Sequence, residues 1–583
     1  MLVDVSIPER GINSLAYEAD SELEEGARVI VSIKETRYTG LILGESQTKL
    51  PPYVKVKPVE GIIDDKRVID SDIWELAKWA GKFSMCGMSK ALRASLPHQF
   101  LTGEKLLPPP KVESPAKFTE RNFFNPFDRE RVNFFVSELD SDLRTLILFP
   151  RKEDAKSFFM NLPESLKAES LLWIYESPEF FEMWKMIQSR KFRVVIAPPG
   201  GVFAPLVPQK IIVEDEASPS HVIPYTLNFS ARSLAGQRAL ILGAELILSG
   251  RIPSLKTYRR TKPREIIRPE RKNVIITDIK FSRKEKTPGI EGNIQLTYSL
   301  TSRTHKELAE GHNVLWILNR TGESSEVFCS NCGESVKCPK CGGIMQARNN
   351  GDILKCKRCG TIRELPRICE KCGYHLLVGK RPGIEALAKI AGKYFRDVHI
   401  YTEGVKISDL HGLILSTSKG LGLLGEIDPS LVAWLDLDSE LWRLNHDNRF
   451  NVYKAISDSY WRGRIRDSTR KVLFQTRRKG MILANFFVRG WEKFLPCELR
   501  ERKEFMLPPY GYVVDVECGD RKLRNDIIDS LMDAGLFVMD PGYASKMFYV
   551  NSESLEAVIK SLEPENFIRG TKTQFLNVTV RSD

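Results

Sequence analysis

The N-terminal part of the chain is patterned like a series of β-strands. Residues 1–7 (MLVDVSI) alternate apolar and polar positions, and the runs 27–33 and 40–43 concentrate Val, Ile and Leu. Such alternation and such β-branched runs predict strands, and a helix is expected around Ile73–Phe83. The pattern therefore predicts a β-rich N-terminal domain over residues 1–98.

Two later sets of short apolar runs predict parallel sheets. The first set comprises 146–150, 193–196, 210–213 and 239–242, and the second comprises 314–318, 413–415, 431–435 and 472–474. Runs of this length, mostly separated by enough chain for a helix, are typical of strands buried on both faces of an α/β layer. We therefore predict a multidomain α/β protein whose two parallel-sheet lobes lie at 131–262 and 263–495.

Proline-rich segments separate these regions. LPPP at 107–110 and Pro115 mark a linker over residues 99–130, and LPPY at 507–510 opens a stretch that we expect to be a small α+β domain within 496–583. No apolar run reaches 18 residues, and the N-terminus lacks the apolar core of a signal peptide. We therefore expect a cytoplasmic protein without membrane spans.

The charge of the chain is unevenly distributed. Its 583 residues hold 87 Lys and Arg against 75 Asp and Glu, a net charge of +12, and a chain of this length forms roughly three to five domains. Residues 251–286 alone carry 13 basic against 4 acidic residues, an excess of +9, and a second basic run covers 462–479. Such runs are often solvated faces or linkers, but two of them beside a metal module favour a nucleic-acid partner.

Eight of the 11 cysteines form four CxxC pairs, each followed by glycine: Cys329/Cys332, Cys338/Cys341, Cys356/Cys359 and Cys369/Cys372. A CxxC turn directs two thiolates to one ion, and eight thiolates make two four-cysteine zinc sites. A disulfide framework would need an oxidising compartment, and iron–sulfur proteins usually have other spacings. A closed four-thiolate site is structural, and spacing alone does not say which pairs share an ion.

Together these features resemble the PriA family of bacterial proteins that restart stalled replication forks. Residues 315–322 (LWILNRTG) are similar to the family segment that precedes its cysteines, and 435–438 (LDLD) and 507–510 are similar to two further family motifs. The resemblance implies RecA-like helicase lobes, with a zinc module over 326–378 inserted in the second. It also implies nested zinc pairing, in two sets: Cys329, Cys332, Cys369 and Cys372 for zinc 1, and Cys338, Cys341, Cys356 and Cys359 for zinc 2.

The ATP site of that family is eroded here. Residues 210–217 (KIIVEDEA) resemble its Walker B strand, with Glu214 and Asp215 in exchanged order, but we favour a buried strand ending in an acidic loop. No GxxxxGK[ST] phosphate loop occurs, and 132–142, where the family has it, holds neither glycine nor lysine. Arg462 remains from the family's arginine-finger segment. The sequence therefore disfavours ATP and Mg²⁺ as cofactors, and we expect no ATP hydrolysis.

The N-terminal domain resembles the family's domain for DNA 3′ ends. Lys57 stands where the family lysine contacts the DNA end, while Leu15, Ala16 and Tyr17 replace a motif whose carboxylate would accept from a 3′-hydroxyl, and Lys34 occupies a glycine position. Further DNA contacts are expected from Arg259 and Arg260, in the basic run that the resemblance places between the lobes. The family's winged-helix domain does not fit into 99–130.

Three functions remain open at this point. The first is a replication-restart factor that binds branched or single-stranded DNA at stalled forks and promotes primosome assembly without unwinding. The second is an active ATP-dependent 3′→5′ DNA helicase with an atypical nucleotide site, and the third is a zinc-ribbon scaffold for other proteins. The resemblance further implies single-stranded DNA-binding protein, primosome loading proteins and the replicative helicase as partners, and a location at the nucleoid.

Overall fold

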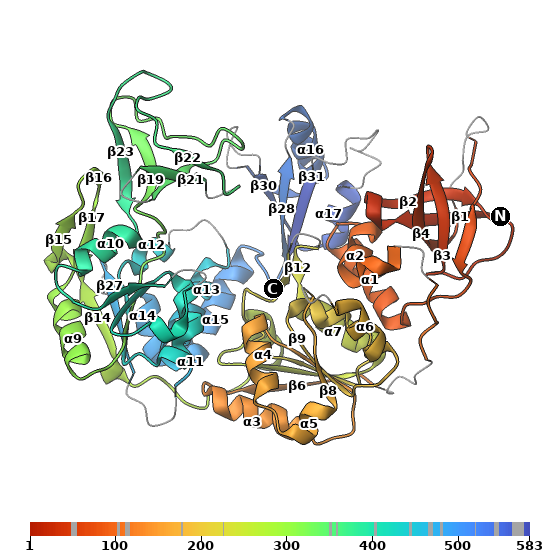
Figure 1. The fold of residues 1–583 in the computed structure, drawn as a ribbon, viewed down its shortest axis with the longest axis horizontal. Coiled ribbons are helices and arrows are strands. Elements are labelled where there is room, and N and C mark those ends of the chain that lie inside the picture. Colours follow the sequence, from red (N-terminus) through yellow and green to blue (C-terminus); the bar gives the residue numbers. More distant parts are fainter. Residues whose placement is uncertain are drawn as a thin grey trace. The chain divides into compact units, whose positions relative to one another are not determined.

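The structure is a computed structural model in which two units can be distinguished (Figure 1). The first unit consists of residues 1–125, 130–263 and 497–583, and the second of 126–129 and 264–496. The structure describes residues 1–47, 55–101, 105–110, 117–175, 179–224, 227–348, 352–356, 359–401, 405–441, 446–464, 470–477, 482–518, 521–540, 547–562 and 576–582.

The N-terminal residues form an antiparallel sheet, as their alternating pattern predicts. Its strands are ordered β2-β1-β4-β3-β5, with β1 at Leu2–Ile7, β2 at Ile12–Glu18, β3 at Arg28–Ile33, β4 at Thr36–Glu45 and β5 at Gly61–Asp64. Arg28 is fully buried, and its guanidinium donates to Asp64 at 2.6 Å and to the carbonyl of Phe100 at 2.9 Å. This pair ties the sheet to the segment that leaves it.

Two helices, α1 (Ser71–Phe83) and α2 (Met88–Ser95), follow the N-terminal sheet. The buried Asp72 of α1 pairs with the buried Arg238 of α7 (Ala231–Leu242) at 2.6 Å, and Arg238 also donates to the carbonyls of Val202 and Ala204. Apolar residues of α1 belong to the same core as those of the first lobe. The expected helix around Ile73–Phe83 is therefore confirmed, and it packs against the lobe.

A six-stranded, all-parallel sheet forms the first lobe. Its strand order is β6-β13-β10-β7-β9-β8, with β6 at Thr119–Phe124, β7 at Thr145–Leu148, β8 at Ser170–Leu172, β9 at Val194–Ala197, β10 at Lys210–Val213 and β13 at Glu245–Gly250. The helices of this lobe are α3 (Asp128–Glu138), α4 (Lys152–Met160), α5 (Glu164–Ala168), α6 (Phe180–Gln188), α7 and α8 (Leu255–Thr261), and a small ribbon pairs β11 (Val222–Ile223) with β12 (Phe229–Ser230).

Successive strand residues of this sheet enter different cores. Ile147, Ile196 and Ile212 pack with residues of α3 and α4, whereas their neighbours Leu146 and Ile211 pack with residues of α6 and α7. Because side chains alternate across a strand, a continuous apolar run supplies both faces, which is the reason that these runs predict parallel strands.

Two expectations about this lobe are corrected by the structure. The stretch 99–130 was expected to be a linker, but Thr119–Phe124 within it forms β6 of the lobe sheet. The run 239–242 was expected to be a strand, but it is the last turn of α7, which ends at Gly243 with a φ of 67°. The strand is the next apolar run, β13. A short apolar run does not distinguish a buried helix end from a buried strand.

The C-terminal residues form an antiparallel sheet with two helices, which confirms the small α+β fold. The strand order is β29-β30-β28-β31, with β28 at Tyr512–Cys518, β29 at Phe537–Met539, β30 at Met547–Ser552 and β31 at Leu576–Arg581, and the helices are α16 (Arg521–Asp533) and α17 (Leu555–Ser561). The expected boundary at 495/496 falls within α15 (Trp491–Glu504). Val514, Phe548 and other sheet residues join the core of the first lobe.

A second six-stranded parallel sheet forms the other lobe. Its order is β14-β27-β26-β18-β25-β24, with β14 at Val274–Asp278, β18 at Val314–Ile317, β24 at Val398–Ile400, β25 at Leu413–Ser416, β26 at Leu431–Trp434 and β27 at Lys471–Thr476. Four of these strands match the second set of apolar runs, and β14 and β24 were not anticipated. The helices are α9 (Tyr298–Ala309), α10 (Ile384–Ala391), α11 (Leu424–Ile427), α12 (Leu437–Leu441), α13 (Asn448–Trp461), α14 (Ile482–Arg489) and α15.

The cysteine-rich segment follows β18 directly, as expected. It forms a sheet of its own with the order β16-β23-β19-β20-β21-β22, in which β16 is Ile290–Glu291, β19 is Ser324–Cys329, β20 is Met345–Arg348, β21 is Ile353–Cys356, β22 is Ile362–Glu364 and β23 is Leu377–Pro382. A two-stranded ribbon of β15 (Arg283–Lys286) and β17 (Asn293–Leu296) lies nearby in the chain. No helix of the described residues is long and apolar enough to cross a membrane.

Candidate metal centres and the remnant of a nucleotide site

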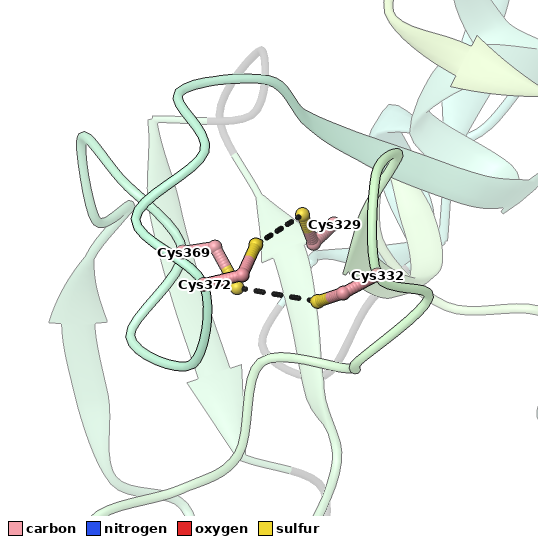
Figure 2. Close-up of side chains that lie close together, drawn as sticks. All are labelled: Cys329, Cys332, Cys369 and Cys372. Atoms are coloured by element: carbon pink, nitrogen blue, oxygen red, sulfur yellow. Dashed lines mark hydrogen bonds between the residues drawn. The ribbon is translucent and has the colours of Figure 1, made fainter.

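The first four-cysteine cluster is made by the two ends of the inserted module (Figure 2). The Cys329 and Cys372 sulfurs lie 3.6 Å apart, and those of Cys332 and Cys369 lie 3.7 Å apart. Strands β19 and β23 create this meeting, because their antiparallel register sets Cys329 opposite Leu377, near the end of the last CxxC turn. The cluster therefore closes the module at its base.

The second cluster lies between these ends. Cys338 and Cys359 have sulfurs 3.5 Å apart, as do Cys341 and Cys356. All four ligand atoms lie within 4.8 Å of one another. The grouping that the family resemblance implies, with the middle two CxxC pairs enclosed by the outer two, is the one that the structure brings together.

Each CxxC turn is closed by the glycine that follows it. Gly333, Gly342, Gly360 and Gly373 all have φ near +70°, and each backbone N–H donates to the carbonyl of the first cysteine of its pair at 2.9 to 3.1 Å. A side chain at this φ would be strained, which explains why glycine recurs there. The turn leaves both thiols of a pair directed to one side.

The cysteine clusters fit metal ions. Four sulfurs around an ion at about 2.3 Å in a tetrahedron are separated by about 3.8 Å, close to the observed distances and far from an S–S bond. The two clusters can therefore hold one metal ion each.

The first strand-to-helix junction of the first lobe is too short for a phosphate loop. In a P-loop protein this junction carries glycines whose N–H groups wrap the phosphates. Here β6 and α3 are joined by Asn125, Pro126 and Phe127 alone. Residues 132–142, where the sequence placed the family's loop, instead form most of α3 and the turn after it. A three-residue turn with a proline offers few N–H groups to a phosphate.

Glu214, the first acidic residue after β10, already has a cation beside it. The guanidinium of Arg131, on α3, donates to its Oε1 at 2.9 Å and to the carbonyl of Asn125 at 2.6 Å. Arg131 is 2% exposed and Glu214 is 8% exposed. Water screens such a pair little, so the Glu214 carboxylate is neutralised by a side chain of the same lobe.

The two acidic residues that follow are similarly engaged. Asp215 lies 3.8 Å from Arg251, and its φ of 51° is uncommon for a residue other than glycine. Glu216 pairs with Arg232 at 2.5 Å and accepts from the Ser254 backbone N–H at 2.6 Å. All of these side chains are buried.

A fourth pair completes the set at this sheet edge. Arg151, just after β7, donates to both carboxylate oxygens of Asp154, and burial raises the pKa of Asp154. The carboxyl ends of parallel strands are where α/β proteins usually bind ligands. Here the edge holds four arginine–carboxylate pairs.

His221 is a buried residue of this edge that sequence reasoning missed. Its Nε2 lies 2.7 Å from the carbonyl oxygen of Glu214, to which it can only donate, and burial lowers its pKa. The neutral ring therefore holds the acidic loop in place. Neither His221 nor Arg131 belongs to a motif, and Arg131 reaches its partner across 83 residues of chain, so no local signal could have identified these contacts.

The segment around Arg462, which resembles an arginine-finger segment, is tightly packed. The Arg462 N–H closes α13 on the carbonyl of Asp458, and Arg464 stacks on Tyr460, with its guanidinium 4.3 Å from the ring centroid. Arg464 and Arg470 are buried. Two arginines of the basic run 462–479 thus belong to the interior, and its residues 465–469 and 478–479 lie outside the described residues.

The segment 126–129 belongs to this second unit. The Phe127 ring meets Trp461 edge-on, with the centroids 5.5 Å apart, and the Asp128 carboxylate accepts from the Gly463 N–H at 2.8 Å. The carboxyl edge of the second sheet also pairs internally, because Arg320 lies 3.4 Å from Asp436 of the LDLD segment.

The residues expected at a DNA 3′ end do lie together. The Lys57 ammonium donates to the Lys34 carbonyl at 2.5 Å and to the Ser32 hydroxyl at 3.4 Å, and the Tyr17 hydroxyl donates to the Ser32 carbonyl. Lys34 has a φ of 54°, the conformation in which glycine is favoured. Ala16 is half-buried and supplies no polar side-chain atom. Lys57 is thus an exposed cation, and position 16 supplies no carboxylate.

Arg259 and Arg260, the other expected DNA contacts, have partners in the first unit. Arg259 donates to the Pro509 carbonyl at 2.5 Å and stacks over Tyr510 at 4.2 Å, while Arg260 pairs with Glu120 at 2.6 Å. Through these contacts both arginines hold α8 against neighbouring segments of the first unit.

Comparisons with known proteins agree with the N-terminal geometry. A family model described as the 3′DNA-binding domain (3′BD) matches residues 3–97. The replication restart protein PriA of Thermotoga maritima is 23% identical over 413 residues, covering 65% of this chain and 55% of the relative. That of Helicobacter pylori is 24% identical over 356 residues, covering 56% and 53%, and that of Borreliella burgdorferi is 21% identical over 518 residues, covering 79% and 77%.

The chain spans about half the length of the first two of these relatives. Among solved structures, RecG bound to a three-way DNA junction matches with 8% identity and a TM-score of 0.35, covering 66% of this chain and 44% of that one.

We expect two metal ions per chain. Cys332→Ser and Cys341→Ser should each reduce the count from two to one, because each removes a thiolate from a different cluster. Inductively coupled plasma mass spectrometry of the purified variants measures this. Cys86→Ser, which changes a cysteine outside both clusters, should retain two ions. A loss of both ions from either single variant would contradict two independent sites.

We also expect Arg131 to be essential to the stability of the first lobe. Arg131→Ala leaves the Glu214 carboxylate buried without its partner, which costs about 3–5 kcal/mol, whereas Arg131→Met/Glu214→Leu should cost much less. Calorimetric unfolding measures the difference. The control is Arg37→Ala, which removes an exposed pair with Glu60 and should cost about 0–1 kcal/mol. Equal losses in Arg131→Ala and the double variant would show that the pair is not coupled.

Proposed function

The chain belongs to the PriA family, and from this premise we propose that it is a replication-restart factor. It binds branched or single-stranded DNA at stalled forks and promotes primosome assembly there, without ATP-driven unwinding. Its match to a DNA-binding domain over residues 3–97 supports the DNA-binding part of the proposal.

The observation that carries the absence of unwinding is the Arg131–Glu214 pair. Mg²⁺ in a nucleotide site needs carboxylate and hydroxyl oxygens, and the phosphates need a glycine-rich loop and a lysine. Arg131 already pairs with the Glu214 carboxylate, and the turn of residues 125–127 has neither glycine nor lysine. The Arg131–Glu214 pair and the short turn lie on the same side of the sheet. They therefore support the loss of a single nucleotide site rather than two unrelated sequence changes.

Zinc is the metal that the two clusters best suit. Sets of four thiolates in CxxC turns are typical of structural zinc, and a closed tetrahedron leaves no ligand position for catalysis. The core beneath the turns is small, with buried Val327, Met345 and Leu354 among its members. Zinc would therefore supply much of the stability of this module, and we assign it no role in a chemical step.

Phosphate contacts are the sequence-independent part of DNA binding. Lys57 is exposed beside the Ser32–Lys34 turn and suits a phosphate at a DNA end. With Ala16 in place of a carboxylate, the pocket has no acceptor there for a 3′-hydroxyl. We therefore propose general affinity for DNA ends with little discrimination between end chemistries.

The protein partners follow from the family. We propose single-stranded DNA-binding protein, the primosome loading proteins and the replicative helicase as partners, and a location at the nucleoid. Glu214 and Asp215, the remaining acidic residues of the ATP site, and Arg462 have no catalytic step in this proposal.

Nucleotide binding separates this function from that of an active helicase. We expect no heat of binding when ATP and Mg²⁺ are titrated into the protein by calorimetry, with or without forked DNA, because the phosphates meet no cradle. DNA-stimulated ATP turnover that disappears in Glu214→Ala/Asp215→Ala would instead establish the helicase.

Fork binding should weaken steeply with salt, because each phosphate contact releases counterions. Fluorescence anisotropy with a labelled fork at several salt concentrations gives the slope. Lys57→Ala should weaken binding and reduce the slope by about 1, whereas Lys66→Ala, an exposed lysine of the same domain, should not. A 3′-phosphate should change the affinity less than about threefold from that of a 3′-hydroxyl.

Affinity that does not depend on salt, or the lack of any shift of forked DNA, contradicts the proposal. Intact affinity for partner proteins without DNA binding would point to the scaffold.

A further inference from the structure

Two aromatic side chains of the second unit lie almost entirely in solvent. Phe281 is 85% exposed and Tyr298 is 83% exposed. Phe281 ends the short helix η5 (Ile279–Phe281) just before β15, and Tyr298 begins α9 just after β17. Exposed rings of this size leave a large apolar area in water, so two of them at the ends of neighbouring strands call for an explanation.

The register of the ribbon places the two residues at the same end. Arg283 lies opposite Leu296 and Lys284 opposite Gln295, in the antiparallel pairing of β15 and β17 (Figure 1). Phe281 lies two residues before Arg283, and Tyr298 lies two residues after Leu296. Both rings therefore belong to the same end of the ribbon.

The backbone that carries both rings is firmly held. Just before β15, the Asp278 carboxylate accepts from the Lys280 N–H at 2.8 Å, and the Ser282 hydroxyl donates to the Ile279 carbonyl at 2.6 Å. Just after β17, the Thr297 hydroxyl accepts from the Leu300 N–H and caps α9. A fixed backbone limits the entropy that a ligand must remove when it stacks on the rings.

The charge around the rings is positive and open to solvent. Residues 280–286 (KFSRKEK) hold four basic residues and one acidic residue, a net charge of +3. The one acid, Glu285, accepts from the Tyr394 hydroxyl at 2.5 Å, and Arg283 shares that hydroxyl. Within the described part of the chain, no carboxylate lies within ion-pair distance of Lys280, Lys284 or Lys286. These lysines are therefore available to an anionic ligand.

We propose that this end of the ribbon binds single-stranded nucleic acid. Bases stack on Phe281 and Tyr298, and phosphates contact Lys280 and Lys284. The combination of exposed aromatic faces with unpaired cations is what unpaired strands require, since a base supplies a ring and each nucleotide a charge. The inference rests on the proposed function and deepens it, because it locates the single-stranded part of the DNA on the second lobe.

The test measures binding of a labelled oligothymidine by fluorescence anisotropy. Phe281→Ala and Tyr298→Ala should each weaken binding about tenfold, and the double variant about a hundredfold. Tyr298→Phe should retain affinity, because the stacking face remains. Phe537→Ala removes a ring that is 63% exposed in the C-terminal domain and should have no effect. All of these side chains lie in solvent, so the melting temperature should not change.

An abasic strand of the same length separates stacking from charge. It offers phosphates without rings, so Phe281→Ala/Tyr298→Ala and the parent protein should bind it equally. Lys280→Ala/Lys284→Ala should weaken binding to both strands and reduce the salt slope by about 2.

The outcomes distinguish this inference from the proposed function. Strong binding of oligothymidine that the ring variants leave unchanged overturns the inference and leaves the proposed function intact. A parent protein that binds neither fork nor single strand overturns both. Ring variants that lose a protein partner while keeping their affinity for the strand make the surface a protein site and also overturn the inference.

Discussion

Buried arginine–carboxylate pairing is the constraint on which the first lobe depends. Four carboxylates at the carboxyl edge of its sheet have an arginine beside them. Three of these pairs are buried, Arg131 with Glu214, Arg232 with Glu216 and Arg251 with Asp215, and the fourth, Arg151 with Asp154, is half-buried. An ATPase would divide this negative charge between Mg²⁺ and protein groups. Here an arginine of the protein lies beside each of these carboxylates. Burying such a pair costs the desolvation of both the arginine and the carboxylate. Removing one partner lowers the stability more than replacing both with apolar residues, because the remaining charge is buried alone.

The sequence revealed those parts of the molecule that depend on short stretches of chain. CxxC turns with a following glycine are local features, so the eight cysteines predicted two metal clusters without any knowledge of the fold. Which CxxC turns share a cluster could not be predicted in this way. Spacing allows several pairings, and it is the antiparallel register of β19 and β23, set by residues far from any cysteine, that brings Cys329 to Cys372. The family resemblance implied that grouping; the residues alone did not.

Where expectation and structure differ, a local pattern was ambiguous or a contact was distant. The apolar run 239–242 continues a helix because no turn precedes it, and Gly243 then ends the helix before β13 begins at Glu245. Strand β6 was missed because four of the six residues of TERNFF are polar, and it is an edge strand with its partner 126 residues away. Arg131 was missed for a related reason. From the sequence alone, an arginine on a helix is interpreted as a solvated charge, because only the fold shows that an acid lies beside it.

The same reasoning changes the meaning of the basic runs. Arginine serves this chain in its interior, where a planar guanidinium can donate to several carbonyls at once, as Arg470 does to Pro429 and Leu424. Lysine at 280, 284 and 286 stays in solvent, where a compact ammonium on a flexible stem suits a phosphate. A net charge, to which each arginine and each lysine contributes +1, does not show this difference between buried arginines and exposed lysines. Arg464 and Arg470 of the run 462–479 are buried, whereas Lys280, Lys284 and Lys286 lie in solvent. The net charge of a basic run therefore exceeds the charge that it exposes to solvent.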